Sequence, residues 1–230
     1  MGEPICEQLV RDVVRGKDFA EVGGLWGTSN EQVTTAGLGG ARELTMIDIA
    51  PPETELWTRF EERCESMGVS GVAQINGSID DSAIVARAGN FDVVCCNGVL
   101  YHCPDPLRTL LNLRAVTRGT LILGTVTIPE TVSTAAGVLE TAPGSALPVP
   151  ALSQSQLAVV GQWLRDLGDI HIQADGITHA VHWDRDDYSP WWWLFTRDHV
   201  AALLRIAGFE VEAVASYWSG RASYFRARAV

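Results

Sequence analysis

The feature that most constrains the fold is an alternation of short apolar runs with longer helical patterns between residues 18 and 126. This alternation predicts strands at 18–22, 44–49, 72–75, 91–96 and 120–126, and helices at 30–38, 53–67, 82–88 and 106–115. Such an order is typical of βαβ units, which build a parallel sheet with helices on both faces. A further helix at 3–15 is expected to cover the sheet or a site at its edge.

The regular alternation ends after residue 126. Four prolines within 128–150 predict a segment without regular structure, which inside a compact domain is usually a lid or an insertion. Helices are predicted at 153–167 and 196–207, the second beginning at Thr196 and ending at Gly208. Strands at 209–216 and 222–229 are joined by a turn at Trp218-Ser219-Gly220. We expect one domain over 1–230, with an N-terminal helix in 1–17 and a lid or substrate insertion at 128–192.

Composition limits the classes of partner that the chain is expected to bind. The 28 acidic residues outnumber the 17 basic ones, giving a formal net charge of −11. A nucleic-acid partner is therefore disfavoured, because Lys and Arg supply most of the affinity for phosphates. The sequence shows neither a long apolar span nor a secretory signal, so a cytoplasmic protein without a membrane segment is expected. The five cysteines form no CxxC pair, and the neighbours Cys95 and Cys96 should point to opposite faces of their strand.

A glycine-rich turn follows the first predicted strand. Residues 21–27 read Glu-Val-Gly-Gly-Leu-Trp-Gly, and Asp48 closes the second strand. Glycines let the backbone approach a ligand, and an acidic residue about 20 positions later lies where a ribose-binding carboxylate belongs. The pattern alone fits several nucleotide cofactors, including NAD. Glu21 disfavours a dinucleotide, because its carboxylate would repel a pyrophosphate.

The turn, Asp48 and the segment 91–107 together resemble class I S-adenosylmethionine-dependent methyltransferases. That segment reads Phe-Asp-Val-Val-Cys-Cys-Asn-Gly-Val-Leu-Tyr-His-Cys-Pro-Asp-Pro-Leu and is most similar to the subgroup related to the tRNA wobble-uridine carboxymethyltransferase. The resemblance covers 19–129 and, more loosely, 191–230. It implies a Rossmann-like, doubly wound α/β fold, a seven-stranded sheet with an antiparallel last strand, and S-adenosyl-L-methionine as cofactor.

The chain departs from this family in two respects. Leu25 occupies the middle glycine position of the usual acidic-x-Gly-x-Gly-x-Gly motif, and Gly24 stands one residue early. The sequence is also expected to have no counterpart of the N-terminal extension of the wobble-uridine enzymes, and it has few basic residues to hold tRNA. Their tRNA substrate and their carboxylated cofactor are therefore not carried over.

The resemblance implies which residues meet the cofactor. They are Glu21, Gly23, Gly24, Trp26, Asp48, Ile49, Ile79, Asp80, Asn97 and Tyr101. Glu21 and Gly23 would approach its amino-acid end, and Asp48 would accept hydrogen bonds from the ribose. Ile79 and Asp80 would flank the adenine, and Asn97 and Tyr101 would line the methionine portion. Trp26 is expected to pack either on the cofactor or in the core.

The substrate side is expected at the end of the fourth strand. Methyl transfer from a sulfonium needs the nucleophile held close to the methyl group, and a base where that nucleophile is a hydroxyl. His102 follows the fourth strand at the sheet edge where open α/β folds bind ligands, so it is the expected base. The alternative is that His102 only orders the loop before Pro104.

The segment 175–193 is rich in tryptophan and histidine. Its expected substrate-binding residues are His179, His182, Trp183, Tyr188, Trp191 and Trp192. Aromatic faces suit a pocket for a sugar or an aromatic ring, although the tryptophans could instead dock the insertion onto the core.

No metal site is predicted. His179, His182 and Asp184 match no zinc signature, and Asp186 and Asp187 favour a solvated acidic loop over a magnesium site. The sequence favours a methyltransferase that O-methylates a small molecule such as a sugar or a secondary metabolite. An RNA methyltransferase and a non-catalytic S-adenosylmethionine-binding module are the alternatives.

Overall fold

The computed structural model describes residues 5–26, 31–166 and 189–230. Its main sheet has seven strands in the order β10-β11-β5-β4-β1-β2-β3. Their bounds are β1 Asp18–Val22, β2 Glu43–Asp48, β3 Val72–Asn76, β4 Phe91–Asn97, β5 Thr117–Val126, β10 Phe209–Tyr217 and β11 Ala222–Ala229. Strand β11 runs antiparallel to both neighbours, β5 and β10, and the other pairs are parallel. The predicted seven-stranded, doubly wound sheet with an antiparallel last strand is confirmed.

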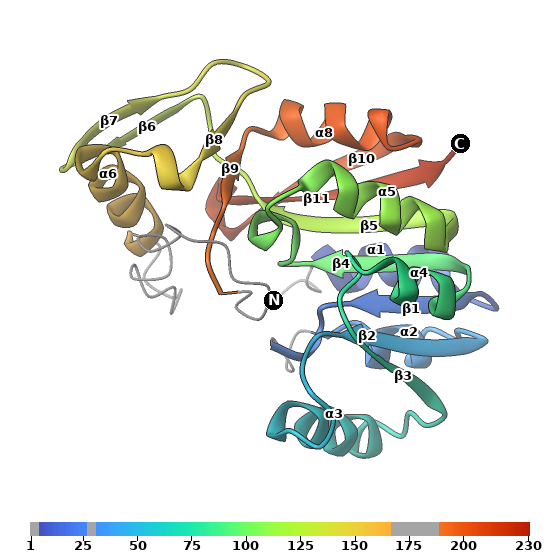
Figure 1. Ribbon diagram of the computed structural model, residues 1–230. Helices are drawn as coiled ribbons and strands as arrows, with labels where there is room; N and C mark the ends of the chain where they lie inside the picture. Colours follow the sequence, from blue (N-terminus) through green and yellow to red (C-terminus); the bar gives the residue numbers. More distant parts are fainter. Residues whose placement is uncertain (1–4, 27–30, 167–188) are drawn as a thin grey trace.

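Helices cover both faces of the sheet (Figure 1). One layer holds α1 Ile5–Val14, α2 Val33–Leu38 and α3 Glu55–Ser66, and the other holds α4 Ser82–Ala88, α5 Pro106–Val116 and α8 Arg197–Ile206. Cys95 is buried in the first layer and Cys96 in the second, as the period of two along a strand predicts. Among the helices of the described residues, none is long and apolar enough to cross a lipid bilayer.

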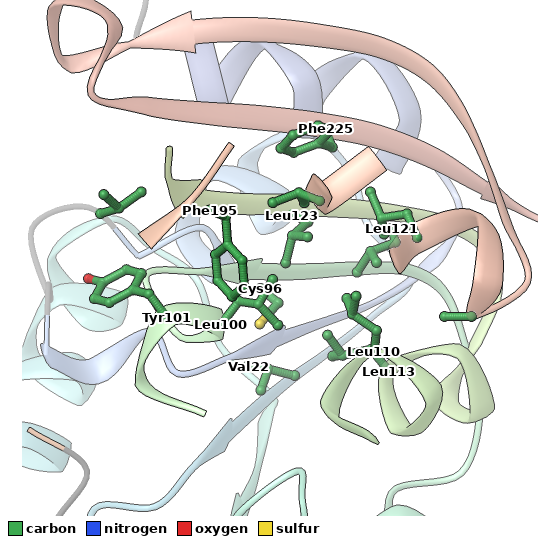
Figure 2. Packing of buried hydrophobic residues seen from close by; sticks show 14 of the residues in the cluster. Val22, Cys96, Leu100, Tyr101, Leu110, Leu113, Leu121, Leu123, Phe195 and Phe225 are labelled. Atoms are coloured by element: carbon green, nitrogen blue, oxygen red, sulfur yellow. The ribbon is translucent and has the colours of Figure 1, made fainter. Parts of the chain in front are cut away.

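The larger core cluster fills the layer of α4, α5 and α8. Leu110 and Leu113 of α5 gather with Leu121 and Leu123 of β5, and all four are fully buried (Figure 2). Burying a leucine side chain stabilises a fold by roughly 2 kcal/mol, so this contact anchors the sheet firmly. Tyr101 lies at the border of the cluster, where β4 has ended (Figure 2). The loop after β4 is therefore attached to a rigid support.

An insertion leaves the sheet after β5. It contains β6 Thr131–Thr134, β7 Gly137–Glu140, β8 Ala146–Pro148 and α6 Gln154–Arg165, and it returns through β9 Trp193–Phe195. Strands β6 and β7 form a hairpin, and β8 pairs with β9. The two ends of the insertion meet, because the Ile128 N–H donates to the Phe195 carbonyl at 2.8 Å. Figure 1 shows this unit beside the sheet, with α6 packed under the hairpin.

The expectation that 128–150 lacks regular structure is wrong, since β6, β7 and β8 lie there. The prolines do not prevent pairing because they stand before, between or at the ends of these short strands, where no ladder hydrogen bond is needed. Other boundaries shift by a few residues: α2 begins at Val33, β5 already begins at Thr117, and Ile49 lies just beyond β2.

Candidate active site

The turn after β1 packs directly on the loop after β4. Gly23 has a φ of +78°, a conformation that favours glycine. A Cβ on Gly23 would lie 2.3 Å from Val99 Cγ2, so only glycine fits this contact. The turn is held from the other side by the Gly23 N–H, which donates to the Ile47 carbonyl at 2.9 Å. The carboxyl ends of β1, β2 and β4 thus meet in one place.

Glu21 is buried at the end of β1 and caps α2. Its Oε2 accepts hydrogen bonds from the N–H groups of Gln32 at 2.6 Å and Val33 at 3.1 Å. Burial, together with the neighbouring carboxylate of Glu31, raises the pKa of Glu21 well above its ordinary value. We expected this carboxylate to face the amino-acid end of the cofactor. In the structure one of its oxygens fixes the start of α2 beside the glycine turn.

Glu31 completes this buried acidic pair, and nothing in the sequence pattern pointed to it. Its side chain is fully buried and accepts hydrogen bonds from Arg63 Nε at 2.7 Å and from the Thr34 N–H at 2.9 Å. The guanidinium of Arg63 supplies the compensating charge from α3. Glu21 and Glu31 therefore hold α2 and α3 together behind the glycine turn.

Asp48 joins the turns that follow β1 and β2. Its Oδ2 accepts a hydrogen bond from the Leu25 N–H at 3.1 Å, and its Oδ1 accepts one from the Ala50 N–H at 2.8 Å. Burial raises the pKa of Asp48, and these two backbone donors, together with the Ile49 N–H, oppose that effect. A carboxylate offers about four acceptor positions, so these three donors leave capacity for a hydroxyl donor of a ligand.

The irregular glycine turn has a packing explanation. Leu25 is fully buried in the layer of α1, α2 and α3, so a large side chain is accommodated at the middle glycine position. At Gly24 a Cβ would lie 2.6 Å from Glu21 Cδ, so the glycine is required one residue earlier. Trp26 is 77% exposed, so the core alternative is wrong, and packing on the cofactor stays a prediction. Leu25 occupies that core position instead.

Ile79 and Asp80 follow β3 and differ in exposure. The Ile79 side chain is 3% exposed and belongs to the core cluster. Asp80 is half-buried, and its Oδ1 accepts a hydrogen bond from Thr109 Oγ1 at 2.8 Å. Burial raises the pKa of Asp80. Of the pair expected beside the adenine, Asp80 is the one whose side chain lies at the surface of the site.

The loop after β4 carries an aromatic cluster formed by Tyr101, His102 and Trp191. The centroid of the Tyr101 ring lies 4.2 Å from the centroid of the His102 ring and 4.5 Å from that of the Trp191 ring. His102 Nδ1 lies 2.9 Å from the Pro190 carbonyl oxygen. A carbonyl only accepts hydrogen bonds, so Nδ1 carries the proton and Nε2 is the basic nitrogen of the neutral ring. Pro190 was not foreseen from the sequence.

The expected substrate-binding residues are only partly covered. His179, His182, Trp183 and Tyr188 lie outside the described residues, as do Asp184, Asp186 and Asp187. Trp191 is buried, and the Trp192 N–H donates to the Tyr101 carbonyl at 2.9 Å, so both dock the insertion onto the β4 loop. Within the described ranges, no group of three His, Cys, Asp or Glu side chains is arranged to hold a metal ion.

These residues fit S-adenosylmethionine, because the carboxyl groups of Asp48 and Asp80, near the ends of β2 and β3, are hydrogen-bond acceptors that suit a ligand with hydroxyl and amine donors. Comparison with known proteins agrees. Residues 37–214 match a family model described as a methyltransferase domain. No curated protein matches the sequence.

Several solved structures share the fold. The magnesium protoporphyrin IX methyltransferase of Synechocystis PCC 6803, with bound S-adenosylhomocysteine (SAH), has 13% identity and a TM-score of 0.57, covering 98% of this chain and 84% of that one. The 1,6-didemethyltoxoflavin-N1-methyltransferase of Burkholderia thailandensis has 13% identity and a TM-score of 0.55, covering 98% and 79%. The N-terminal domain of EvdMO1, in the presence of SAH and D-fucose, has 17% identity and a TM-score of 0.56, covering 100% and 85%.

Nothing in these comparisons supports the wobble-uridine subgroup, and at such identities the structural likeness shows the fold alone. The family match spans most of the chain, from α2 to β10. The chain therefore belongs to the methyltransferase-domain family and is an S-adenosylmethionine-dependent methyltransferase.

Proposed function

We propose that this chain methylates a hydroxyl group of a small molecule, such as a sugar or a secondary metabolite, with His102 as the general base. The observation that carries the proposal is the hydrogen bond from His102 Nδ1 to the Pro190 carbonyl. It fixes the tautomer in which Nε2 can take a proton. His102 follows β4 at the carboxyl edge of the sheet, where open α/β folds bind their ligands.

The cofactor would lie along the ends of β1, β2 and β4. Gly23 lets the turn after β1 pack against Val99 of the β4 loop, Asp48 would accept from the ribose hydroxyls, and Asp80 would accept from the adenine amine. When bound, S-adenosylmethionine supplies a methyl group activated by a sulfonium. The chain itself has to orient the acceptor and remove its proton, which needs no covalent intermediate.

The acceptor would lie against the Tyr101–His102–Trp191 cluster. Aromatic faces bind flat or ring-shaped molecules through a large apolar area. A net charge of −11 disfavours an acceptor rich in phosphates. The names of the similar structures point the same way, since protoporphyrin, didemethyltoxoflavin and D-fucose are all small molecules.

The test compares His102→Asn with His199→Asn. Both histidines place Nδ1 near a backbone carbonyl, His199 at 3.0 Å from that of Gly144, but His199 lies on α8 away from the cluster. SAH release is followed with a panel of small-molecule alcohols and with tRNA. We expect His102→Asn to lower the rate about 100- to 1000-fold without changing cofactor affinity, and His199→Asn to change neither.

Other outcomes separate the alternatives. A full rate in His102→Asn would remove the base assignment. Methylation of tRNA but not of the alcohols would favour the RNA enzyme. Cofactor binding without any methyl transfer would favour a non-catalytic binding module.

A further inference from the structure

Tyr217 connects the edge of the sheet to the end of β4. It is the last residue of β10, and its hydroxyl donates to Asn97 Oδ1 at 3.3 Å. Its ring stacks on that of Tyr224 in β11, with the centroids 4.3 Å apart and an angle of 20° between the planes. Burial raises the pKa of the Tyr217 phenol, so it keeps its proton at neutral pH and remains a donor.

A glycine on β5, Gly124, leaves the space into which the Asn97 amide oxygen points. Asn97 pairs with Gly124 in the register of β4 and β5. A Cβ on Gly124 would lie 2.2 Å from Asn97 Oδ1 and 2.5 Å from Tyr224 Cε1. Oδ1 is thus directed over β5. The amide nitrogen is directed away from β5, and the neighbour on the other side of β4 is β1 with its glycine turn.

The turn after Tyr217 holds that residue firmly. Trp218 and Ser219 have φ values of +48° and +49°, a left-handed conformation that residues with side chains rarely adopt. Arg221 fixes this turn to the insertion, because its Nε donates to the Trp163 carbonyl at 2.7 Å. Its own carbonyl accepts from the Thr127 N–H at 3.0 Å. The Tyr217 hydroxyl is therefore presented to Asn97 from a braced position.

We propose that Tyr217 is a positioning residue of the cofactor site, which holds the Asn97 amide so that Nδ2 faces the glycine turn. This inference rests on the proposed function, in which Asn97 meets the methionine portion of the cofactor. That portion ends in a carboxylate, which needs hydrogen-bond donors. Without the phenol, the amide is free to rotate and to present Oδ1, an acceptor, in place of Nδ2.

The experiment is calorimetric titration of S-adenosylmethionine into the full-length wild type, Asn97→Ala, Tyr217→Phe and the double variant. We expect Asn97→Ala to weaken binding about tenfold or more and Tyr217→Phe about three- to tenfold, the range for one hydrogen bond. The double variant should bind within about twofold of Asn97→Ala, because Tyr217 acts only through Asn97. Thermal unfolding checks that each variant is folded.

Tyr224→Phe is the matched control. It removes the same atom from the other ring of the stack, whose phenol interacts with both the Cys6 thiol and the Tyr217 phenol. It should weaken binding clearly less than Tyr217→Phe does, because the hydroxyl that donates to Asn97 is that of Tyr217. An equal loss of affinity in Tyr224→Phe would show a packing effect and overturn the inference. Wild-type binding by Tyr217→Phe alone would overturn it while leaving the cofactor site intact. Wild-type binding by Asn97→Ala would instead remove the proposed cofactor site, and the inference with it.

Discussion

On the β1–β2 side of the site, the polar contacts join residues that are close in sequence. Glu21 meets Gln32 across 11 positions, and Asp48 meets Leu25 across 23. On the β4 side the corresponding contacts join residues that are far apart in sequence. His102 contacts Pro190 across 88 positions, and Asn97 contacts Tyr217 across 120.

This difference indicates which side of the site needs the rest of the chain to be folded. Closing a long loop costs more conformational entropy than closing a short one, so distant contacts need the surrounding fold to be complete. The β1–β2 side is a local unit made by consecutive elements. The β4 side exists only when the insertion and the β10–β11 hairpin are both in place. Mutations should therefore affect the two sides differently.

The largest effect is expected from Asp48→Ala on the local side. It leaves the buried N–H groups of Leu25 and Ala50 without their acceptor, which should lower the free energy of unfolding by about 3 kcal/mol. Cofactor affinity should fall by more than about 100-fold, because the ribose acceptor is lost as well. Urea denaturation and calorimetry measure the two effects.

Asp92→Asn is the control for that variant. Asp92 also accepts a hydrogen bond from a backbone N–H, that of Asp18 at 3.1 Å, but this contact lies at the amino ends of β4 and β1, opposite to the site. It should lose stability without losing cofactor affinity. Wild-type cofactor affinity in Asp48→Ala would contradict the placement of the ribose.

A smaller effect is expected from Gly124→Ala, which places a methyl group against Asn97, one partner of the most distant contact. The added methyl group would collide with Asn97 Oδ1 and Tyr224 Cε1, costing about 2 kcal/mol of stability and weakening cofactor binding. Gly161→Ala in α6 is the comparison, since there a methyl group meets only the mobile end of Arg165. If both variants unfold at the wild-type urea concentration, the β4 side is less tightly packed than its contacts indicate.

Next in size is a pH effect from Glu21→Gln. The folded pKa of Glu21 lies above its ordinary value of 4.5, so the protonated form favours folding, and this contribution disappears as the pH rises through the folded pKa. Glutamine carries no charge. The stability of Glu21→Gln relative to wild type should therefore increase as the pH rises from 4.5 through the folded pKa.

Chemical denaturation at several pH values checks this effect. A constant difference between Glu21→Gln and wild type would mean that α2 satisfies the Glu21 charge completely.

The smallest effect is expected from Arg221→Gln at the junction of the hairpin and the insertion. It removes a guanidinium that lies 5.1 Å from the centre of the Trp163 ring and donates to the Trp163 carbonyl. A loss of about 1 kcal/mol is expected, with faster proteolysis of the insertion. Arg228→Gln removes only surface ion pairs with Glu210 and Glu212 and should be close to neutral. Equal effects of the two would show that Arg221 does not brace the turn.

The succession of strands and helices along the chain and the place of Asp48 could be predicted, because they depend on local periodicity and a short motif, and the antiparallel last strand followed from the family resemblance. Strands β6 to β9 could not, since three or four residues carry too little periodicity. The shift of glycine to Gly24 was visible in the sequence, but its reason, the contact with Glu21, was not. Tyr217 and Pro190 had no local signal, because their partners are brought near only by the complete fold.

The meeting of the insertion's two ends has a consequence for how such a chain can change. The Ile128 to Phe195 hydrogen bond and the Thr127–Phe195 bridge close the insertion at its base. Doubling the length of a flexible segment between closed ends costs only about 0.6 kcal/mol in chain entropy. Segments of different length or composition can therefore be exchanged at this point while the sheet keeps its register. The preference for the methyl acceptor can therefore change through the insertion, while the part of the chain that binds the cofactor stays the same.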